Sequence, residues 1–419
     1  MACGGSEDSA FFEVETEGGV SGKFNVSWCV DGYRMPEVGL TVEGSKGVMR
    51  VNDDELELSL NGGERFRWFR HDLRDDVGFW LGAPEYYRED ECFVEAVLRG
   101  GSVEACFGAA AKVDRLIDEV LVKAGRVGLV KCETRNVNSV KEAVREALKL
   151  IEYSLPKTRK IVIKPNMCYY WDWSTGQTTD PVFVAALIEL FREDISSDVE
   201  ISIVESDASA MKCKYAFKYL GYEKLAKEYN VNLVNLSEVE TEKATVKVKD
   251  EVFELSVPKI IKDADLRVNV PKMKYMGFTK ISAALKNIYG CNPYPKKFQY
   301  HSKLDEVIVA LNKVMPFNLH VLDGLTVCGS KTLRLGLVMA SQDPVAIDAV
   351  AATVMGVNPK SVIHLRLAEK EGLGKTSFVI KGVNIDYFRK RFPRKGLSEK
   401  AITLGYRVAC KLGLDKRLV

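Results

Sequence analysis

The sequence is poor in the residues that build common metal and cofactor sites. It has only four histidines among 419 residues, too few and too dispersed to predict a histidine-rich metal site. The ten cysteines are scattered, and no two of them form a Cys-x-x-Cys pair. The sequence therefore predicts neither a zinc ribbon nor a ferredoxin-type cluster. Scattered free thiols are typical of a protein in a reducing compartment.

Long apolar runs and an excess of charge are also lacking. No run approaches the roughly 20 apolar residues that span a bilayer, and the N-terminus, MACGGSEDSAFF, lacks the basic and apolar segments of a signal peptide. Lysine and arginine number 60 against 58 acidic residues, so the net charge is +2. We therefore expect a cytoplasmic protein that binds neither nucleic acid nor a membrane. The composition is ordinary for a globular protein of two or three domains.

Short strands separated by glycines dominate the first 125 residues. An antiparallel meander is predicted, followed by two amphipathic helices over Glu85–Leu98 and Ala105–Lys123. The predicted strands are Phe11–Glu17, Gly22–Val30, Val38–Glu43, Gly47–Asn52 and Leu56–Leu60. Strands followed by helices favour a small α+β domain with helices on one face of the sheet.

Three segments of this domain resemble the C-terminal domain of the Gfo/Idh/MocA oxidoreductases. They are SEDSAFFEVETEGGVSGKFNVSW, LTVEGSKGVMRVNDDELEL and YYREDECFVEAVLRGGSVEACFGAAAKVDRLIDEVL. That family binds its nicotinamide cofactor on a Rossmann domain, but no Gly-x-Gly-x-x-Gly follows a strand here, so NAD is not expected from this chain alone. The resemblance implies a sheet that pairs with a second copy or with a partner subunit, and no catalytic residue is carried over.

Strands and helices alternate over residues 127–382. Strands are predicted at Val127–Cys132, Lys160–Ile163 and Glu200–Val204, each followed by an amphipathic helix. Later strands are predicted at Asn232–Asn235, Leu266–Val270, His320–Leu322, Leu335–Ala340 and Phe378–Lys381. This alternation favours an α/β domain with a mainly parallel, doubly wound sheet. Residues 383–419 are predicted to form a basic tail with a helix over Glu399–Leu412.

The stretch Leu266–Pro293 carries the strongest functional signal. It reads LRVNVPKMKYMGFTKISAALKNIYGCNP, a buried strand followed at once by Lys272 and Lys274. Apolar residues at helical spacing then predict a helix over Thr279–Tyr289 that carries Lys280 and Lys286.

Polar side chains also follow the other predicted strands. In open α/β sheets, ligands lie outside the carboxyl ends of the strands, so these side chains are expected to converge on one crevice. We predict a site for an anionic small molecule, a carboxylate or phosphate, bound by Lys164, Asn166, Lys274, Lys286 and Asn287. We assign catalysis to Lys272, Asp207 and Asp323. The two aspartates would hold a divalent metal or act as general bases, and a crowded Lys272 or Lys286 would act as nucleophile or base.

Some polar residues at or near the predicted site also have a simple structural explanation. Asp180 and Asp343 each precede a proline, as helix N-caps do. Asp348 lies inside an apolar helix, where pairing with a lysine would have a purely structural role. Asn287 would simply end a helix, and Lys164-Pro165-Asn166 would form a turn.

Motifs over about residues 127–382 resemble domain of unknown function 362. They are IKPNMCYY, TTDPVFVAALIEL, ESDAS, GYEKLAKEYNVNLVNL, VPKMKYMGFTKISAALKNIYG, VLDG and ASQDPVAIDAVAATVMG. The family usually has a histidine soon after the second motif lysine, whereas Lys274 is followed here by Tyr275 and Met276. Many members carry an added ferredoxin module, whose clustered cysteines this chain lacks. The α/β pattern is also faintly similar to nickel-pincer racemases, but the histidines expected for that cofactor are absent.

Two further hypotheses belong to other classes of protein. One is a non-catalytic interaction subunit of an oxidoreductase complex, acting through the N-terminal sheet. The other is an iron–sulfur or thiol redox protein using Cys168, Cys291 and Cys328.

Overall fold

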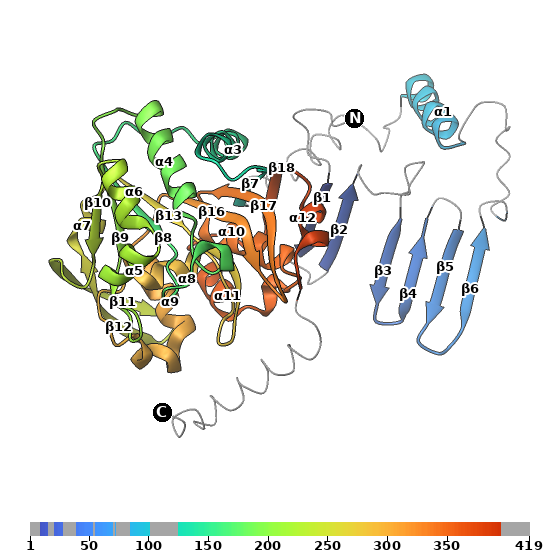
Figure 1. Ribbon diagram of the computed structural model, residues 1–419. Coiled ribbons are helices and arrows are strands. Elements are labelled where there is room, and N and C mark those ends of the chain that lie inside the picture. Colours follow the sequence, from blue (N-terminus) through green and yellow to red (C-terminus); the bar gives the residue numbers. More distant parts are fainter. Residues whose placement is uncertain are drawn as a thin grey trace. The chain divides into compact units, whose positions relative to one another are not determined.

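The computed structural model describes residues 9–15, 21–27, 39–52, 55–69, 72, 84–100 and 125–394. The chain separates into two compact units, Met1–Val120 and Leu121–Val419 (Figure 1). The predicted helix over Ala105–Lys123 and the predicted final helix over Glu399–Leu412 lie outside the described residues.

The first unit contains two small antiparallel sheets and a helix. β1 pairs with β2, and β3 to β6 form a four-stranded meander in sequence order. The elements are β1 Ser9–Glu15, β2 Ser21–Ser27, β3 Leu40–Gly44, β4 Gly47–Val51, β5 Glu55–Leu60, β6 Arg65–Phe69 and α1 Pro84–Arg99. The antiparallel sheet of an α+β unit is therefore confirmed, with strand bounds within a few residues of those predicted. The edge strands β3 and β6 expose apolar side chains, among them Leu40 and Trp68.

The second unit is built on a ten-stranded, mainly parallel sheet of order β10-β9-β8-β13-β16-β17-β7-β18, in which β14 also pairs with β16 and β15 pairs with β14. The α/β fold class is confirmed. The strands are β7 Gly125–Lys131, β8 Lys160–Pro165, β9 Glu200–Glu205, β10 Asn232–Asn235, β13 Leu266–Val270, β14 Lys272–Met276, β15 Lys280–Ser282, β16 Leu319–Cys328, β17 Thr332–Ser341 and β18 Phe378–Gly382.

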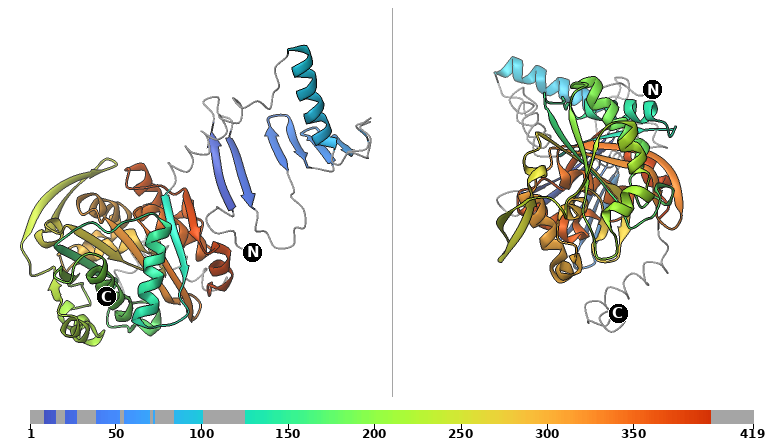
Figure 2. Two further views of the ribbon diagram at one scale, coloured as in Figure 1. Left: turned by 90° about the horizontal axis from the view of Figure 1, so that it is seen from above. Right: turned by 60° about the vertical axis from the view of Figure 1, so that its left-hand side comes forward.

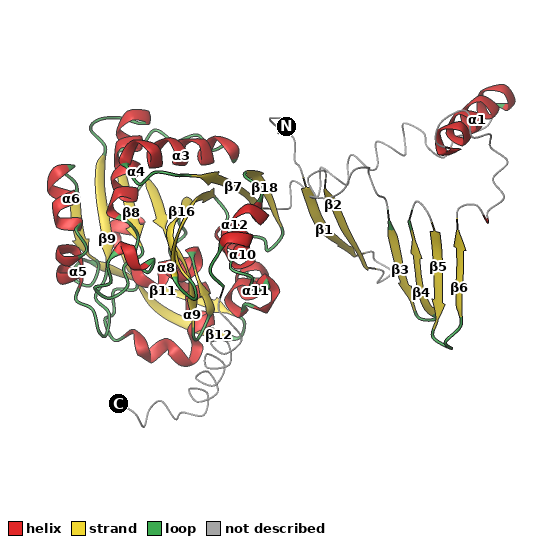
Figure 3. Ribbon diagram, turned by 45° about the vertical axis from the view of Figure 1, so that its right-hand side comes forward, coloured by secondary structure: helices red, strands yellow, loops and turns green. Residues whose placement is uncertain are grey.

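Helices cover both faces of this sheet, and each face has its own hydrophobic core (Figure 3). On one face lie α3 Val137–Leu150, α4 Pro181–Asp194, α5 Cys213–Tyr219 and α6 Tyr222–Glu228. On the other lie α7 Lys259–Lys262, α8 Ala284–Ile288, α9 Leu304–Val314, α10 Pro344–Val354, α11 Ile363–Lys370 and α12 Ile385–Arg391. The short 3₁₀ helices are η3 Trp173–Thr175, η4 Tyr289–Cys291, η5 Lys297–Lys303 and η6 Pro359–Ser361. Burial on two faces explains the near-continuous apolar runs of the central strands.

A long hairpin of β11 Thr241–Val248 and β12 Glu251–Pro258 runs along the outside of this unit (yellow-green in Figure 2). Its inward side chains, including Leu255 and Val257, join the core beside α9. The sequence of Val246–Val257 predicts a small hairpin-like insertion, which is confirmed, and the observed hairpin extends beyond these bounds.

Caps predicted from the sequence begin two of the helices. The Asp180 carboxylate accepts the backbone N–H of Val182, and Pro181 occupies the first turn of α4. Asp343 accepts two N–H groups of α10 in the same way, with Pro344 in the first turn. Each aspartate satisfies orphan donors of a helix N-terminus, so their capping role is established.

The helix predicted over Thr279–Tyr289 is wrong in its first half. Lys280 has a φ of 65° in the left-handed region, and Lys280–Ser282 forms β15, which pairs with β14. The helix proper is α8, and only Lys286 of the two predicted lysines lies on it. The pairing of β15 with β14 outweighs the helical spacing of the apolar residues. Lys272 and Lys274 themselves lie in β14.

Three other boundaries differ from the prediction. The apolar spacing over Tyr215–Tyr229 predicts a single helix, but the structure has two, because Gly221 has a φ of 83° and separates them. β16 and β17 are longer than predicted and form an antiparallel hairpin in the middle of the sheet. The segment beyond residue 383 is not wholly a tail, because Phe388 and Phe392 are buried in the core.

Candidate functional site

Lys164 is the second-last residue of β8, and only 1% of its side chain is exposed. Its ammonium donates to Glu205 Oε2 at 2.8 Å and to the carbonyl of Pro165 at 2.7 Å. Glu205 ends the neighbouring strand β9 and is itself 3% exposed. Parallel pairing of β8 with β9 therefore places the two groups at the same edge of the sheet.

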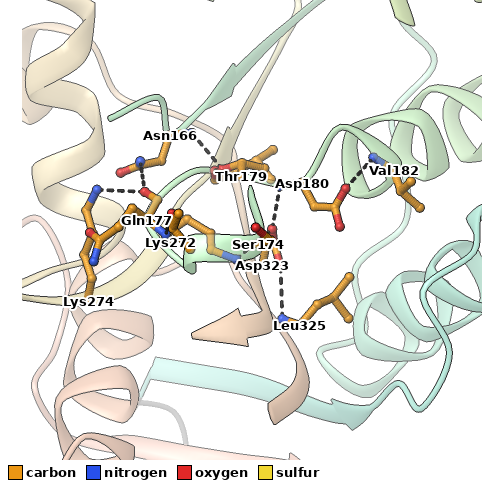
Figure 4. A network of polar contacts seen from close by, with 12 residues as sticks. Asn166, Ser174, Gln177, Thr179, Asp180, Val182, Lys272, Lys274, Asp323 and Leu325 are labelled. Carbon is orange, nitrogen blue, oxygen red and sulfur yellow. Dashed lines mark hydrogen bonds and ion pairs between the residues drawn. The ribbon is translucent and has the colours of Figure 1, made fainter. Parts of the chain in front are cut away.

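Lys272 and Lys274 are held by β14, which continues the sheet beyond the end of β13. The first part of β16 pairs with β13 and its later part with β14, so Lys272 lies opposite Asp323. Lys272 Nζ lies 3.0 Å from Asp323 Oδ2, and neither side chain is exposed. The Lys272 ammonium has no aligned hydrogen bond, so charge attraction holds this pair. Two residues further, Lys274 points to the same side of the strand and donates to the carbonyl of Gln177 at 2.9 Å (Figure 4).

The loop from Asn166 to Asp180 closes over these lysines. Gln177 accepts through one carbonyl oxygen from both Lys274 and the Asn166 side chain (Figure 4). The Thr179 hydroxyl accepts from the Asn166 N–H and donates to the carbonyl of Val270, the last residue of β13. Gly176 has a φ of 71°, and a Cβ there would lie 2.5 Å from the Val327 carbonyl carbon of β16. The loop is thus fixed to the sheet at both ends, and Asn166 acts in positioning it.

Two more lysines reach the same place from outside the strands. Lys286 lies on α8, and Lys297, in η5, donates to the Ser206 hydroxyl at 2.5 Å. Burial, assisted by Lys274 and Lys297, lowers the pKa of Lys286 to about 8. Burial also lowers the pKa of Lys297 to about 8. Repulsion by Lys164 lowers this pKa further, and attraction by Glu205 only partly offsets the two effects. Sequence reasoning missed Lys297, which follows no strand.

These five residues form one lysine cluster, namely Lys164, Lys272, Lys274, Lys286 and Lys297. They are close enough to act on one another: burial lowers the pKa of Lys274, and the charges of Lys272 and Lys164 lower it further. Two buried carboxylates, Glu205 and Asp323, pair with members of the cluster. Five ammonium groups against two carboxylates leave an excess of positive charge, which is the property expected of an anion site.

Asp207, predicted beside the lysines, is used elsewhere. Its carboxylate accepts the Cys213 N–H at the start of α5 at 2.8 Å and pairs with the exposed Lys212. Burial acts to raise the pKa of Asp207, but the bonds from Cys213 and Lys212 outweigh it, so the pKa is lowered. An ionised carboxylate with these partners stabilises the start of α5.

Asp323 and Asn287 lie at the cluster but serve the backbone as well. Asp323 accepts the N–H groups of Asp180 and Leu325, at 2.8 and 3.0 Å (Figure 4). Asn287 donates to the carbonyl of Lys164 and to Asn269 Oδ1. Asn269 in turn contacts the fully buried His320, whose pKa burial lowers to about 3, so this imidazole is neutral. The asparagines thus tie α8 to the ends of β8 and β13, which fixes where Lys286 stands.

Asp348 of α10 holds the N-terminus of α8. It is fully buried in α10, and its two oxygens accept the N–H groups of Ala284 and Leu285, at 2.5 and 3.1 Å. Burial raises the pKa of Asp348 to about 8, against the opposing effect of those two bonds. Asp348 therefore pairs with a helix N-terminus rather than with a lysine.

The cysteines at the site differ in their surroundings. Cys168 interacts with Lys274, whose pKa it raises, whereas burial raises the pKa of Cys291 to about 12 and keeps its thiol protonated. Among residues the structure describes, no three histidine, cysteine, aspartate or glutamate side chains are grouped as a metal site. One open hollow of about 310 Å³ lies at the opposite ends of β8 and β9, beside Lys160 and Glu200, and no member of the lysine cluster lines it.

The model of a protein family, the domain of unknown function DUF362, matches residues 161–353. This segment is a DUF362 domain. The whole lysine cluster and both paired carboxylates lie within the DUF362 domain. The resemblance predicted over 127–382 is thus confirmed for its central part.

Similarity to named proteins is more distant. A thylakoid-associated protein of Synechocystis sp. is 26% identical over 141 residues, which cover 30% of this chain and 44% of that protein. The lactate racemase apoprotein of Thermoanaerobacterium thermosaccharolyticum matches with a TM-score of 0.38 and 13% identity, over 57% of this chain and 58% of the other. A protein of Thermotoga maritima matches with a TM-score of 0.30 and 13% identity, over 56% and 57%. The chain therefore spans about half of the length of each.

Other expectations from the sequence stay predictions. These are the Gfo/Idh/MocA resemblance of residues 1–125, a partner at the N-terminal sheet, and the cytoplasmic location. No helix in the described part of the chain is long and apolar enough to cross a membrane.

Proposed function

We propose that the DUF362 domain is an enzyme domain that binds an anionic small molecule, a carboxylate or phosphate, at the lysine cluster. The observation that carries the proposal is the gathering of five lysines from β8, β14, α8 and η5 around only two carboxylates. Burying ammonium groups is costly unless they are compensated. A bound anion would supply the missing compensation, which is the physical reason for expecting one there.

Roles within the proposed site follow from exposure and partners. Lys164 and Lys272 are paired with carboxylates and set the field of the site. Lys274, Lys286 and Lys297 have no carboxylate partner among the described residues, so they are the groups that would contact the anion directly. Asn166 and Asn287 position the loop and α8 that hold these lysines.

Binding of inorganic phosphate or malonate, measured by isothermal titration calorimetry, tests the proposal. The matched variants are Gly290→Ala and Gly62→Ala. A Cβ on Gly290 would lie 2.8 Å from Lys164 Nζ and 3.0 Å from Glu205 Oε1, whereas one on Gly62 would meet nothing within 4 Å. We expect Gly290→Ala to weaken binding about tenfold, because displacing the pair costs about 1–3 kcal/mol. Unchanged affinity in Gly290→Ala, or no binding by the parent protein, would contradict the site.

The protein is expected to take up protons from the solvent when it binds an anion near pH 8. Lys286 and Lys297 have pKa values of about 8 in the free protein, so each is about half protonated at that pH. A neighbouring negative charge favours the ammonium form and raises both pKa values. Calorimetry at pH 8 in buffers of different ionisation enthalpy should therefore show uptake of close to one proton in total, and little uptake at pH 6. Lys286→Met should roughly halve it; equal heats in all buffers at pH 8 would exclude contact with these lysines.

A further inference from the structure

Lys286 differs from the other members of the lysine cluster in having no acceptor. Lys164 pairs with Glu205, Lys272 with Asp323, Lys274 with the Gln177 carbonyl and Lys297 with Ser206. Among residues 125–394 no carboxylate, hydroxyl or carbonyl accepts from Lys286, whose ammonium lies 5.9 Å from the centre of the Tyr289 ring. It is also partly exposed, whereas Lys272 is completely enclosed. An incoming molecule would therefore meet Lys286 before Lys272.

The groups that surround Lys286 disfavour its charge. Burial and the repulsion by Lys274 of β14 and Lys297 of η5 outweigh the attraction by Cys168. Its charge also acts on the buried His364 of α11, whose partner is Asp305. With a pKa of about 8, roughly one Lys286 amine in ten is neutral at pH 7, some hundreds of times the fraction for a lysine at 10.5. A neutral amine beside fixed positive charges is the arrangement that makes a lysine nucleophilic.

We propose that Lys286 forms an imine with the carbonyl carbon of a ligand that also carries a carboxylate or phosphate. This inference rests on the proposed anion site, because the neighbouring ammonium groups would hold the charged end of the ligand. It narrows the substrate class to 2-oxo acids and to aldehydes or ketones bearing a phosphate.

The chemistry balances with groups already present. The neutral Lys286 Nζ attacks the carbonyl carbon while the Lys297 ammonium protonates the carbonyl oxygen, and the attacking nitrogen then returns a proton to Lys297, which gives a neutral carbinolamine. Lys297 next protonates the hydroxyl, which leaves as water while the nitrogen lone pair forms the C=N bond, so the product is a protonated imine beside a neutral Lys297. Lys297, with a pKa of about 8, is able to supply and regain the proton at neutral pH. No oxidant or reductant takes part, and hydrolysis reverses the sequence.

Reductive trapping on the full chain tests this role. The protein is incubated at pH 7 with pyruvate, or in a second arm with glycolaldehyde phosphate, in the presence of sodium cyanoborohydride, and the modified lysines are located by peptide mass spectrometry. The two arms distinguish a carboxylate from a phosphate ligand. We expect the reduced adduct on Lys286 at least about tenfold above that on Lys303, an exposed lysine paired with Glu251. Excess inorganic phosphate should reduce the labelling of Lys286 but not that of Lys303.

A charge-preserving variant separates the imine from simple anion binding. Lys286→Arg should bind inorganic phosphate within about threefold of the parent protein while losing the adduct at position 286, and Lys303→Arg should change neither. Phosphate binding without preferential labelling of Lys286 in either arm would overturn the imine and leave the anion site standing. Absence of phosphate and malonate binding would instead refute the proposed function, whatever the labelling pattern.

Discussion

Replacing Asp323 by alanine is expected to lower the free energy of unfolding by about 3–5 kcal/mol. The carboxylate is completely buried, and it lies 3.0 Å from the equally buried ammonium of Lys272. It also accepts the backbone N–H groups of Asp180 and Leu325. The substitution therefore leaves the buried Lys272 ammonium and two buried N–H groups without their acceptor, and each of these losses lowers the free energy of unfolding.

Urea unfolding of Asp323→Ala and of a matched surface variant measures this effect. Glu251→Ala removes the partner of Lys303 from a pair whose side chains are 50% and 44% exposed, and should cost less than about 1 kcal/mol. Adding Lys272→Met to Asp323→Ala should recover part of the loss, because it removes the stranded charge. A single variant as stable as the parent, or a double variant worse than the single one, would show that the pair is not the source of stability.

The second large effect concerns pH and Asp348. Its pKa is about 8 in the folded protein against 3.8 for an ordinary aspartate, so the folded state holds a proton that the unfolded state has lost. The stabilising contribution is complete below pH 4 and disappears as the pH rises through 8. Between pH 5 and pH 8, Asp348→Asn should therefore gain stability relative to the parent protein, by up to about 4 kcal/mol.

Unfolding free energies at pH 5, 6.5 and 8 decide this point. Asparagine has one acceptor oxygen for the two N–H groups of α8, so we expect a constant penalty of about 1–3 kcal/mol at all three pH values. Asp386→Asn, which removes an exposed partner of Arg389, provides a flat reference profile. Parallel profiles for Asp348→Asn and the parent would mean that the two N–H groups already keep Asp348 ionised at pH 5.

Local patterns predicted much of the second unit. Leu266–Val270 was recognisable as a buried strand because its apolar residues end at a proline, and its bounds are those observed. Asp180-Pro181 and Asp343-Pro344 were recognisable as helix starts because capping needs only neighbours in the chain. Such features depend on short-range geometry, which a single sequence expresses directly.

Pairings between distant segments were not predicted. The hairpin of β16 and β17 turns at Gly329-Ser330-Lys331, and this turn between two apolar runs is the signal that would have revealed it. Lys280–Ser282 was assigned to a helix because its apolar spacing fits one, but the strand β14 captures it instead. In both cases pairing with another strand determines the structure, and the local sequence does not show where that strand lies.

The candidate site was predicted in part for the same reason. Lys164, Lys272, Lys274 and Lys286 do meet at one edge of the sheet, since parallel strands end together. Asp207 was predicted at the site because it follows a strand, but β9 ends at Glu205, so the alternation of side chains along the strand does not extend to Asp207. Asp207 turns to α5, and Glu205 is the carboxylate that meets Lys164. Lys297 could not be found from strand ends at all.

The placement of Lys272 and Lys274 on a paired strand has a consequence for affinity. Immobilising a lysine side chain costs up to about 2 kcal/mol of rotamer entropy, which a ligand must overcome when flexible surface lysines close around it. Here β14 and its neighbours have already restricted both side chains during folding. An anion bound at the proposed site would meet lysine side chains that are already ordered, so it would need less interaction energy than at a site of flexible surface lysines.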